Sequence, residues 1–339
     1  MAGANLLVPG TGGITLIDSH GNDVGWPVLM RLRGIIRGVQ GKSDDELFEL
    51  MGMEHLPGQL APAKTSLKPG VTLHPGHVLR VAYNQFDDLN QFLFDWRADL
   101  RHSAAGLKDF LENTAPTRGK WNLVGHSQGG LLIILASKMM AAQDSLSALV
   151  SSVTLVAPPV AGTLNAAQAM LVGDNAGARL APVMRRTIRT WPAIYQMLPS
   201  WQAVLKADGA PAAPARQLKQ TGGWPGEAGI QADLLLRARE VQAQFVDPLS
   251  HFQGVDTRFY WARNRDTDTG IRRPASGPLG FDRQTKVKGD SLVPFETTVR
   301  WLGDKIGPGD VTVFRAPCEP HAYMLNDPLV SASVRGRLQ

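Results

Sequence analysis

Short apolar segments alternate with longer segments of helical periodicity along most of the chain. The short segments are bounded by glycine, proline or polar residues and carry many β-branched and aromatic side chains, which is typical of buried strands. They predict strands at 5–8, 77–83, 121–125, 152–157, 257–262 and 311–314, with a further short strand or extended arm at 14–18. The longer segments predict helices at 27–39, 43–52, 103–113, 128–142 and 295–302. Strands that alternate with helices in this order predict a mostly parallel sheet flanked by helices.

The segment between residues 160 and 252 has a different pattern from the rest of the chain. Its apolar residues recur at helical spacing, interrupted by loops, and no stretch of it has the pattern of a sheet strand. A segment of this kind between two core strands is typical of an inserted cap. We therefore expect a core made of residues 1–159 and 253–339, and a mainly helical cap made of residues 160–252.

The sequence WNLVGHSQGG, from Trp121 to Gly130, joins an expected strand to an expected helix. Gly-x-Ser-x-Gly at such a junction is typical of the nucleophile elbow of α/β-hydrolases. There the serine occupies a strained turn, and the residues two before and two after it need to be nearly free of side chain because strand and helix approach closely. Gly125 and Gly129 meet that need, which makes Ser127 the candidate nucleophile. The helix that begins beside it would direct its N-terminal N–H groups toward a developing oxyanion.

A glycine-rich loop, from Pro9 to Gly13, follows the first expected strand. It lacks the Gly-x-Gly-x-x-Gly spacing of dinucleotide sites and the lysine of a P-loop, which argues against nucleotide binding. In α/β-hydrolases a loop in this place donates one backbone N–H to the oxyanion hole, and the residue after the nucleophile donates the other. Thr11 and Gln128 are therefore the candidate oxyanion donors, and a plain tight turn is the alternative interpretation of the loop.

A nucleophilic serine needs a base that accepts its proton and an acid that orients the base. In α/β-hydrolases the chain order is serine, acid, histidine, with the histidine after the last strand. Asp290, in an expected tight turn, and His321, after the last expected strand, fit that order. His126 is expected to pack beside the nucleophile rather than to act as the base. The acids that compete with Asp290 in this third of the chain are Asp256, Asp266, Asp268, Asp282 and Asp310.

The composition of the chain limits the ligands and partners that it can bind. The net charge is +5, and Cys318 is the single cysteine, so neither an internal disulfide nor a cysteine metal cluster can form. The positive charge comes without a nucleic-acid-binding motif, so we expect no nucleic acid as a partner. The basic and apolar cap segment from Met184 to Trp201 fits two interpretations, peripheral contact with a lipid surface or packing on the core. We expect no cofactor and no metal, because the histidines of one proline-rich loop lack the spacing of a zinc site; they are His55, His74 and His77.

Several segments of the chain, in their order, resemble the lecithin:cholesterol acyltransferase-like α/β-hydrolases, which include lipases, phospholipases and acyltransferases. They are VPGTGG, FLFDWRADLRHS, WNLVGHSQGG, LVAPPVAGT, GDSLVP and HAYMLNDPLV. The resemblance extends from about Leu6 to Val330, thinly over residues 40–75 and the cap, and GDSLVP and HAYML match where that family keeps its acid and its histidine. It implies Ser127 as nucleophile, Asp290 as acid and His321 as base. It also implies oxyanion donation by Thr11 and Gln128.

These features predict a serine hydrolase that acts on a carboxylic ester through an acyl-serine, by hydrolysis or by acyl transfer. The resemblance implies a lipid or phospholipid ester as the substrate. Two alternatives stay open: an esterase, thioesterase or amidase for small molecules, and a hydrolase-like protein that binds an acyl ligand or a partner without turnover. The first residues lack the pattern of a signal peptide, and no segment reaches the ~18 apolar residues of a membrane span. We therefore expect a cytoplasmic protein, with export by another route and the oligomeric state left open.

Overall fold

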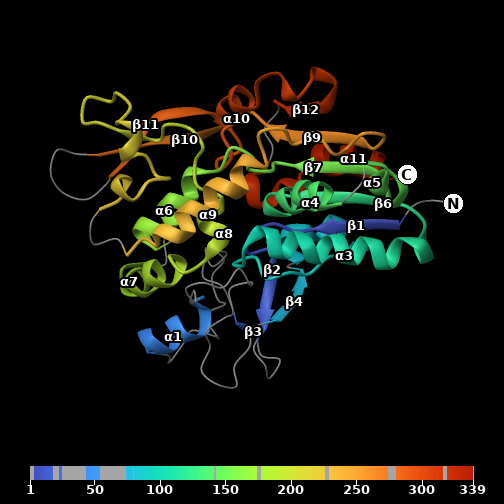
Figure 1. The fold of residues 1–339 in the computed structure, drawn as a ribbon, viewed down its shortest axis with the longest axis horizontal. Helices are drawn as coiled ribbons and strands as arrows, with labels where there is room; N and C mark the ends of the chain where they lie inside the picture. Colours follow the sequence, from blue (N-terminus) through green and yellow to red (C-terminus); the bar gives the residue numbers. More distant parts are fainter. Residues whose placement is uncertain are drawn as a thin grey trace.

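The structure is a computed structural model that describes residues 4–17, 23–24, 43–53, 74–78, 80–140, 143–173, 177–225, 229–273, 280–315 and 319–338. A six-stranded sheet lies at its centre, and every neighbouring pair of strands in it is parallel (Figure 1). The strand order is β12 (Val311–Phe314), β9 (Asp256–Ala262), β7 (Val150–Val156), β6 (Trp121–His126), β1 (Ala4–Val8) and β5 (Asn90–Gln91). The expected parallel central sheet is confirmed.

Helices pack on this sheet, as expected from their apolar residues. In Figure 1, α3 and α4 lie side by side in front of the sheet, and α11 lies behind it. Every residue of β6 is buried, and α4 is buried from Gln128 to Ser137, so the elbow strand and its helix form the middle of the core. These helices are α3 (Leu100–Arg118), α4 (Gln128–Met139), α5 (Gln143–Leu149), α10 (Phe295–Leu302) and α11 (Pro328–Gly336). Single turns of 3₁₀ helix lie in the connections between elements, at η2 (Asn84–Phe86), η6 (Gly303–Lys305) and η7 (Pro308–Asp310).

The expected cap consists of helices joined by loops, and it lies beyond the carboxyl ends of the central strands, on the left of Figure 1. Its helices are α6 (Leu164–Val172), α7 (Gly177–Ile188), α8 (Pro192–Gln196) and α9 (Ala232–Ala243), with 3₁₀ turns η3 (Pro214–Arg216) and η4 (Thr221–Gly223). One short strand, β8 (Val204–Leu205), departs from the expected absence of strands there. The division into a core and a cap of residues 160–252 stays a prediction.

The residues after β9 form a hairpin in a region where the sequence predicts no strand, so the list of expected strands is incomplete there. β10 (Arg265–Arg272) and β11 (Gly280–Gly289) pair antiparallel outside the central sheet. The short cap strand β8 pairs with β10 in parallel, and the Ile271 N–H donates to the Ala203 carbonyl at 2.7 Å. Charged and polar residues fill much of β10 and β11, so the hairpin has little of the apolar pattern that identifies a buried strand.

The expected strand at 77–83 is also wrong in its second half. β4 (His74–Val78) ends early and pairs antiparallel with β2 (Ile14–Ile17), which also pairs with β3 (Asp23–Val24). The next residues form α2 (Arg80–Tyr83), which buries Ala82 and Tyr83. A short apolar run fits either a strand or a buried helix, and here the chain divides it between the two.

The expected helix at 43–52 is confirmed, and it begins with a capping box at Ser43. Ser43 Oγ accepts the Glu46 N–H at 3.3 Å, Glu46 accepts the Ser43 N–H at 2.8 Å, and Gly52 follows the last residue of α1 (Asp44–Met51). α1 packs on the cap helix α7, where the Arg186 guanidinium lies 3.0 Å from Asp45 and 3.8 Å from the centre of the Phe48 ring. The expected helix at 27–39, His55 and Cys318 lie outside the described residues.

Candidate active site

Ser127 occupies the sharp turn between β6 and α4 that the elbow motif predicts. Its backbone has φ 53° and ψ −124°, a conformation that L-residues rarely adopt and that rigid surroundings must hold. The surroundings are tight, because a Cβ on Gly129 would lie 2.0 Å from the Val8 carbonyl oxygen and one on Gly125 would lie 2.7 Å from Ile133. Both glycines are therefore required by close contact between strand, turn and helix.

The structure brings Ser127, His321 and Asp290 together, although they lie far apart in the sequence. His321 Nε2 is 2.8 Å from Ser127 Oγ, and His321 Nδ1 is 2.7 Å from Asp290 Oδ2. All three are buried, with exposed fractions of 8% for the serine, 5% for the histidine and 1% for the aspartate. An ionised carboxylate only accepts hydrogen bonds, so Nδ1 carries the proton and Nε2 is left to accept the Ser127 hydroxyl proton. This is the arrangement that activates a serine.

Backbone hydrogen bonds in two loops fix the positions of Asp290 and His321 relative to each other. Asp290 directly follows β11, and its Oδ1 accepts the N–H groups of Leu292 at 2.9 Å and Val293 at 2.7 Å. His321 begins the 3₁₀ helix η8 (His321–Asn326) after β12, and its backbone N–H donates to the Asp290 carbonyl at 3.1 Å. The hairpin that the sequence did not predict therefore delivers the acid to the histidine loop.

The two candidate oxyanion donors lie next to the elbow. Gln128 is the first residue of α4; its side chain accepts from Thr11 Oγ1 at 2.7 Å and donates to the Trp96 carbonyl at 3.0 Å. Thr11 lies on the turn after β1, where a Cβ on the preceding Gly10 would be 2.8 Å from Ser127 Cβ. The loop and the nucleophile are thus in close contact, and donation by the Thr11 and Gln128 backbone N–H groups stays a prediction.

Two further polar residues, Tyr83 and His126, lie beneath the same site. The Tyr83 hydroxyl is 2.8 Å from the Gly10 nitrogen and 2.9 Å from His126 Nδ1, and His126 Nε2 is 2.9 Å from the His321 carbonyl oxygen. Burial lowers the pKa of His126 to about 3, helped by the neighbouring His321, and burial raises the pKa of Tyr83. The sequence gives no signal for Tyr83, because the residues that it bonds lie far from it in the chain.

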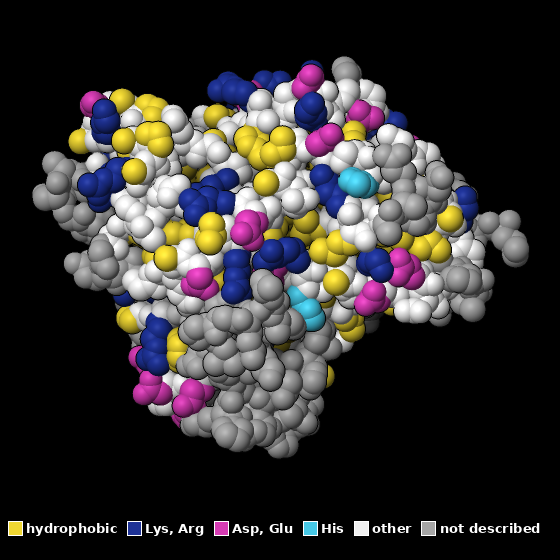
Figure 2. Space-filling view, viewed as in Figure 1, with side chains coloured by type: hydrophobic (Ala, Val, Ile, Leu, Met, Phe, Trp, Pro, Cys, Tyr) yellow, Lys and Arg dark blue, Asp and Glu magenta, His cyan; other side chains and the backbone are white. Residues whose placement is uncertain are grey.

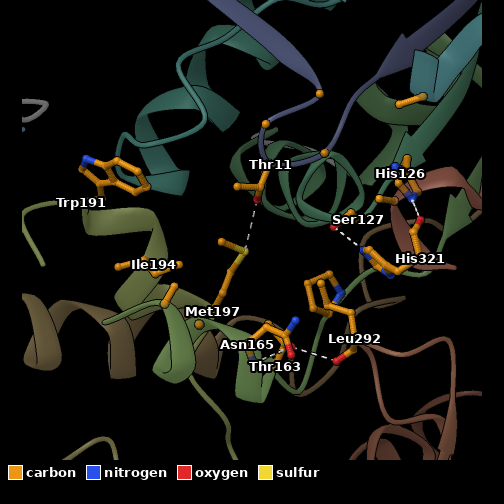
Figure 3. A pocket seen from close by; sticks show the side chains of 18 of the residues that line it. Thr11, His126, Ser127, Thr163, Asn165, Trp191, Ile194, Met197, Leu292 and His321 are labelled. Atoms are coloured by element: carbon orange, nitrogen blue, oxygen red, sulfur yellow. Dashed lines mark hydrogen bonds between the residues drawn. The ribbon is translucent and has the colours of Figure 1, made fainter. Parts of the chain in front are cut away.

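A cavity of about 220 Å³ lies beside Ser127, between the core and the cap (Figure 3). One side, which we call the catalytic wall, consists of Gly10, Tyr83, His126, Ser127 and His321. The opposite side, which we call the cap wall, comes from helices α6 to α8 and consists of Ala166, Ala169, Ile188, Trp191, Ile194 and Met197. In Figure 3 the labelled side chains of the two walls face each other, with Thr11 on one flank and Asn165 on the other. Ser127 thus faces an apolar surface across a small space.

The family model for lecithin:cholesterol acyltransferase matches residues 77–244, about half of the chain. This chain belongs to the lecithin:cholesterol acyltransferase-like α/β-hydrolases. The match includes Ser127 and most of the cap segment, and it ends before Asp290 and His321. Membership of this family supports an enzyme that acts on ester bonds.

The parallel central sheet and its flanking helices form the α/β-hydrolase fold expected of this family. The structure described as the Tle4–Tli4 complex matches with a TM-score of 0.66 and 14% identity, over 99% of this chain and 98% of that one. Mature lipase BlEst2 from Bacillus licheniformis gives a TM-score of 0.40 and 12% identity, over 100% of this chain and 92% of that one. Est1E from Butyrivibrio proteoclasticus gives a TM-score of 0.35 and 14% identity, over 79% of this chain and 74% of that one. At these identities the likeness concerns the fold alone, and no curated protein sequence matches the chain.

Three of the carboxylates that compete with Asp290 in this α/β-hydrolase are engaged elsewhere. Asp256 lies 3.1 Å from Arg337, and Asp266 lies 2.7 Å from Lys288. Asp310 accepts the Gly307 N–H at 2.7 Å as the cap of a 3₁₀ turn. Asp290 is the carboxylate that contacts a histidine near the elbow, which agrees with the order expected of the family.

The basic cap segment packs on the protein through its apolar side. Met184, Ile188, Trp191 and Leu198 are all buried, so these side chains are not available to lie in lipid. Arg186 is exposed and pairs with Asp45, while Arg189 donates to the Met170 carbonyl at 2.8 Å. Figure 2 shows Lys and Arg side chains in small groups interspersed with acidic ones over one face. Of the two interpretations of this segment, packing on the core is the one that its burial supports.

Within the described ranges, no three or more His, Cys, Asp and Glu side chains are grouped so that they could hold a metal ion. None of the described helices combines the length and the apolar character that crossing a bilayer requires.

Proposed function

We propose that this α/β-hydrolase cleaves a carboxylic ester through an acyl-serine intermediate on Ser127. The observation that carries the proposal is the continuous hydrogen-bonded chain from Asp290 through His321 to Ser127, which ends at an apolar cavity. Membership of the acyltransferase-like family agrees with this chemistry. The roles follow from the hydrogen-bond directions: Asp290 orients His321, and His321 accepts the serine proton.

In the first half of the reaction, Ser127 Oγ attacks the ester carbonyl carbon while His321 Nε2 takes the hydroxyl proton. The carbonyl oxygen becomes an oxyanion, which accepts hydrogen bonds from the Thr11 and Gln128 backbone N–H groups. The tetrahedral intermediate then breaks its bond to the alcohol oxygen, and that oxygen takes the proton from His321. The alcohol leaves, and the acyl group stays on Ser127.

In the second half, water or an acceptor alcohol loses a proton to His321 as its oxygen attacks the acyl carbon. The intermediate breaks the bond to Ser127 Oγ, which recovers its proton from His321, and a free acid or a new ester leaves. Removing one oxyanion donor from an acyl-transfer enzyme typically costs ~10²–10³ in turnover. The triad is common to hydrolysis and transfer, so the two differ only in the second nucleophile.

We further propose that the substrate is a lipid ester whose acyl chain lies against the cap wall. The side chains of that wall are aliphatic or aromatic, and burying a methylene there contributes about 0.8 kcal/mol. A cavity of about 220 Å³ is below the ~300–1,000 Å³ of typical ligand pockets, so it fits one chain rather than two. In a diacyl phospholipid the second chain would lie outside the cavity.

The test combines covalent labelling with a panel of esters. A fluorophosphonate should label the wild type and fail to label Ser127→Ala; Ser137→Ala, on the same helix but outside the cavity, should be labelled normally. Labelling that survives in Ser127→Ala contradicts the assignment of the nucleophile. Esters of increasing chain length should show a rise in kcat/KM beyond acetate. A maximum at acetate would favour the alternative of a small-molecule esterase.

Hydrolysis and acyl transfer are separated by product analysis. The protein is incubated with phospholipid vesicles, with and without a long-chain alcohol, and the products are identified by mass. A hydrolase releases fatty acid in both mixtures, whereas an acyltransferase forms the ester of the added alcohol. Neither product from any ester, together with intact binding of the acyl chain, would support a non-catalytic binding protein.

A further inference from the structure

Tyr83 and His126 are buried polar residues that take no part in the proton transfers proposed above. They connect two loops that come from opposite ends of the chain. Gly10, in the loop that carries the candidate oxyanion donor Thr11, contacts the Tyr83 hydroxyl at 2.8 Å. The Tyr83 hydroxyl contacts His126 Nδ1 at 2.9 Å, and His126 Nε2 contacts the carbonyl of the proposed base His321 at 2.9 Å. We call this pair the Tyr83–His126 link.

The direction of every hydrogen bond in the link follows from its partners. The lowered pKa of His126 leaves its ring neutral near pH 7, with one N–H. A backbone carbonyl only accepts, so that N–H is on Nε2 and donates to His321. Nδ1 then accepts the Tyr83 hydroxyl proton, which the raised pKa of Tyr83 keeps in place, and the tyrosine oxygen accepts the Gly10 N–H. A single arrangement of protons therefore gives every polar group of the link a hydrogen-bond partner.

We propose that the Tyr83–His126 link is a positioning device that sets the distance between the oxyanion loop and the base. The inference rests on the function proposed for Ser127. Catalysis needs oxyanion donors about 2.7–3.1 Å from the developing charge while the base stays in hydrogen-bond reach of the nucleophile. These groups lie on separate loops, and a misplacement of about 1 Å can cost ~10²-fold in rate.

The surroundings of the link agree with a positioning role. Gly10 packs against Ser127 so closely that a Cβ would lie 2.8 Å from the serine Cβ, which leaves the oxyanion loop little freedom to shift. The rings of His126 and His321 lie 5.2 Å apart, so the link also limits how the base can rotate. Because His126 is neutral, it places no positive charge beside the imidazolium that forms on His321 during the reaction.

The test uses Tyr83→Phe, with Tyr195→Phe as the matched control. Tyr195 is also buried, donates to a backbone carbonyl (Arg189, 2.8 Å) and accepts a backbone N–H (Gln231, 3.1 Å), but it does not line the cavity. Both variants should lose similar stability in a thermal melt. Tyr83→Phe should lower kcat roughly 10–100-fold with KM changed less than about threefold, because the loss concerns the transition state. Tyr195→Phe should keep the wild-type kcat.

A second pair of variants tests the two ends of the link separately. His126→Gln keeps an N–H near Nε2 for the His321 carbonyl and loses the acceptor for Tyr83, whereas His126→Leu loses both. We expect His126→Gln to lower kcat as much as Tyr83→Phe, and His126→Leu to lower it further. The double variant Tyr83→Phe/His126→Gln should be no slower than either single one, because both remove the same hydrogen bond. If Tyr83→Phe does not fold, the His126 pair carries the test.

The binding of a transition-state analogue gives a readout that a purely structural role would not change. A trifluoromethyl ketone should bind Tyr83→Phe more weakly by the same factor as kcat falls, while an unreactive alkyl amide of the same chain length should bind equally well. Wild-type kcat in the folded Tyr83→Phe protein, or equal losses in Tyr83→Phe and Tyr195→Phe, overturns the positioning role alone. A wild-type protein without ester turnover or labelling at Ser127 overturns the proposed function and the link's role with it.

Discussion

The two walls of the cavity are held in different ways. In the catalytic wall, hydrogen bonds of 2.8–2.9 Å join His321, Ser127, His126 and Tyr83, and a further one of 2.7 Å joins His321 to Asp290 outside the wall. In the cap wall, Ala166, Ala169, Ile188 and Trp191 face the cavity with apolar groups and are positioned by packing. Hydrogen bonds depend steeply on distance and angle, whereas packing depends on volume and area. A small change should therefore stop the reaction at the first wall and alter the choice of substrate at the second.

The largest expected effect is at Asp290, which contacts His321 of the catalytic wall. In Asp290→Asn the amide can place an N–H toward His321 Nδ1, which favours the wrong tautomer, and kcat should fall ~10³–10⁴-fold. Steady-state assays with a chromogenic ester measure the loss. Asp256→Asn, which removes an ion pair with Arg337, is the control and should retain turnover. Equal losses in the two variants would mean that the aspartate positions are merely structural.

The second largest effect is a pH dependence of stability that comes from His126 in the catalytic wall and that the apolar cap wall does not contribute to. The pKa of His126 is about 3 in the folded protein against an ordinary value of 6.5, so below pH 6.5 the unfolded chain binds a proton that the folded protein does not. The stability it contributes is full above pH 6.5 and is lost as the pH falls toward 3, at up to roughly 1.4 kcal/mol per pH unit. Urea unfolding at pH 7 and pH 5 should show this loss. The difference in unfolding free energy between pH 7 and pH 5 should be smaller in His126→Gln and unchanged in the cap-wall variant Ile188→Val.

A third prediction concerns the close backbone contact behind the catalytic wall. In Gly129→Ala the new Cβ would lie 2.0 Å from the Val8 carbonyl, so strand and helix must separate, and stability should fall by about 1–3 kcal/mol or more. In Gly106→Ala, on α3, the Cβ would meet ordinary contact at 3.7 Å. That variant should be neutral or more stable by up to ~1 kcal/mol, because alanine favours a helix. Chemical denaturation of both variants decides whether the elbow is as rigid as its geometry implies.

The smallest effect is expected at the cap wall, as a change in selectivity. In Ala169→Phe the ring should fill part of the cavity and lower kcat/KM for long-chain esters ~10–100-fold while acetate turnover changes little. The neighbouring Gln168→Leu, whose side chain does not line the cavity, should keep the wild-type chain-length profile. A uniform loss at all chain lengths would show that Ala169 supports the catalytic wall instead.

Much of the catalytic wall could be predicted from the sequence, because its signals are local. Ser127 lies in a five-residue motif between a strand and a helix. The two glycines of the motif are explained by the close approach of that strand and helix. Asp290 and His321 follow Ser127 in the expected order, with His321 after the last expected strand, and the structure places both at the elbow. Their catalytic roles, and those of Thr11 and Gln128, await the experiments above.

The rest could not be predicted, because it depends on contacts between distant segments. The hairpin of β10 and β11 has few apolar residues, and its hydrogen bonds come from partners that a periodicity search does not reveal. The apolar run before Tyr83 suits a strand as well as a helix, and its burial in α2 is a tertiary effect. The Tyr83–His126 link follows from the fold alone, since the sequence marked His126 only as a neighbour of the nucleophile.

The pairing of β8 with β10 limits how the cap segment can be exchanged for that of another protein. β8 belongs to the cap segment, β10 pairs with β11, and β11 leads directly into Asp290. A chimera that replaced residues 160–252 with the cap of a relative would need a matching edge strand, or the hairpin before the acid would lose its outer neighbour. New substrate preferences are therefore more easily reached by point changes on the cap helices than by exchange of the whole cap.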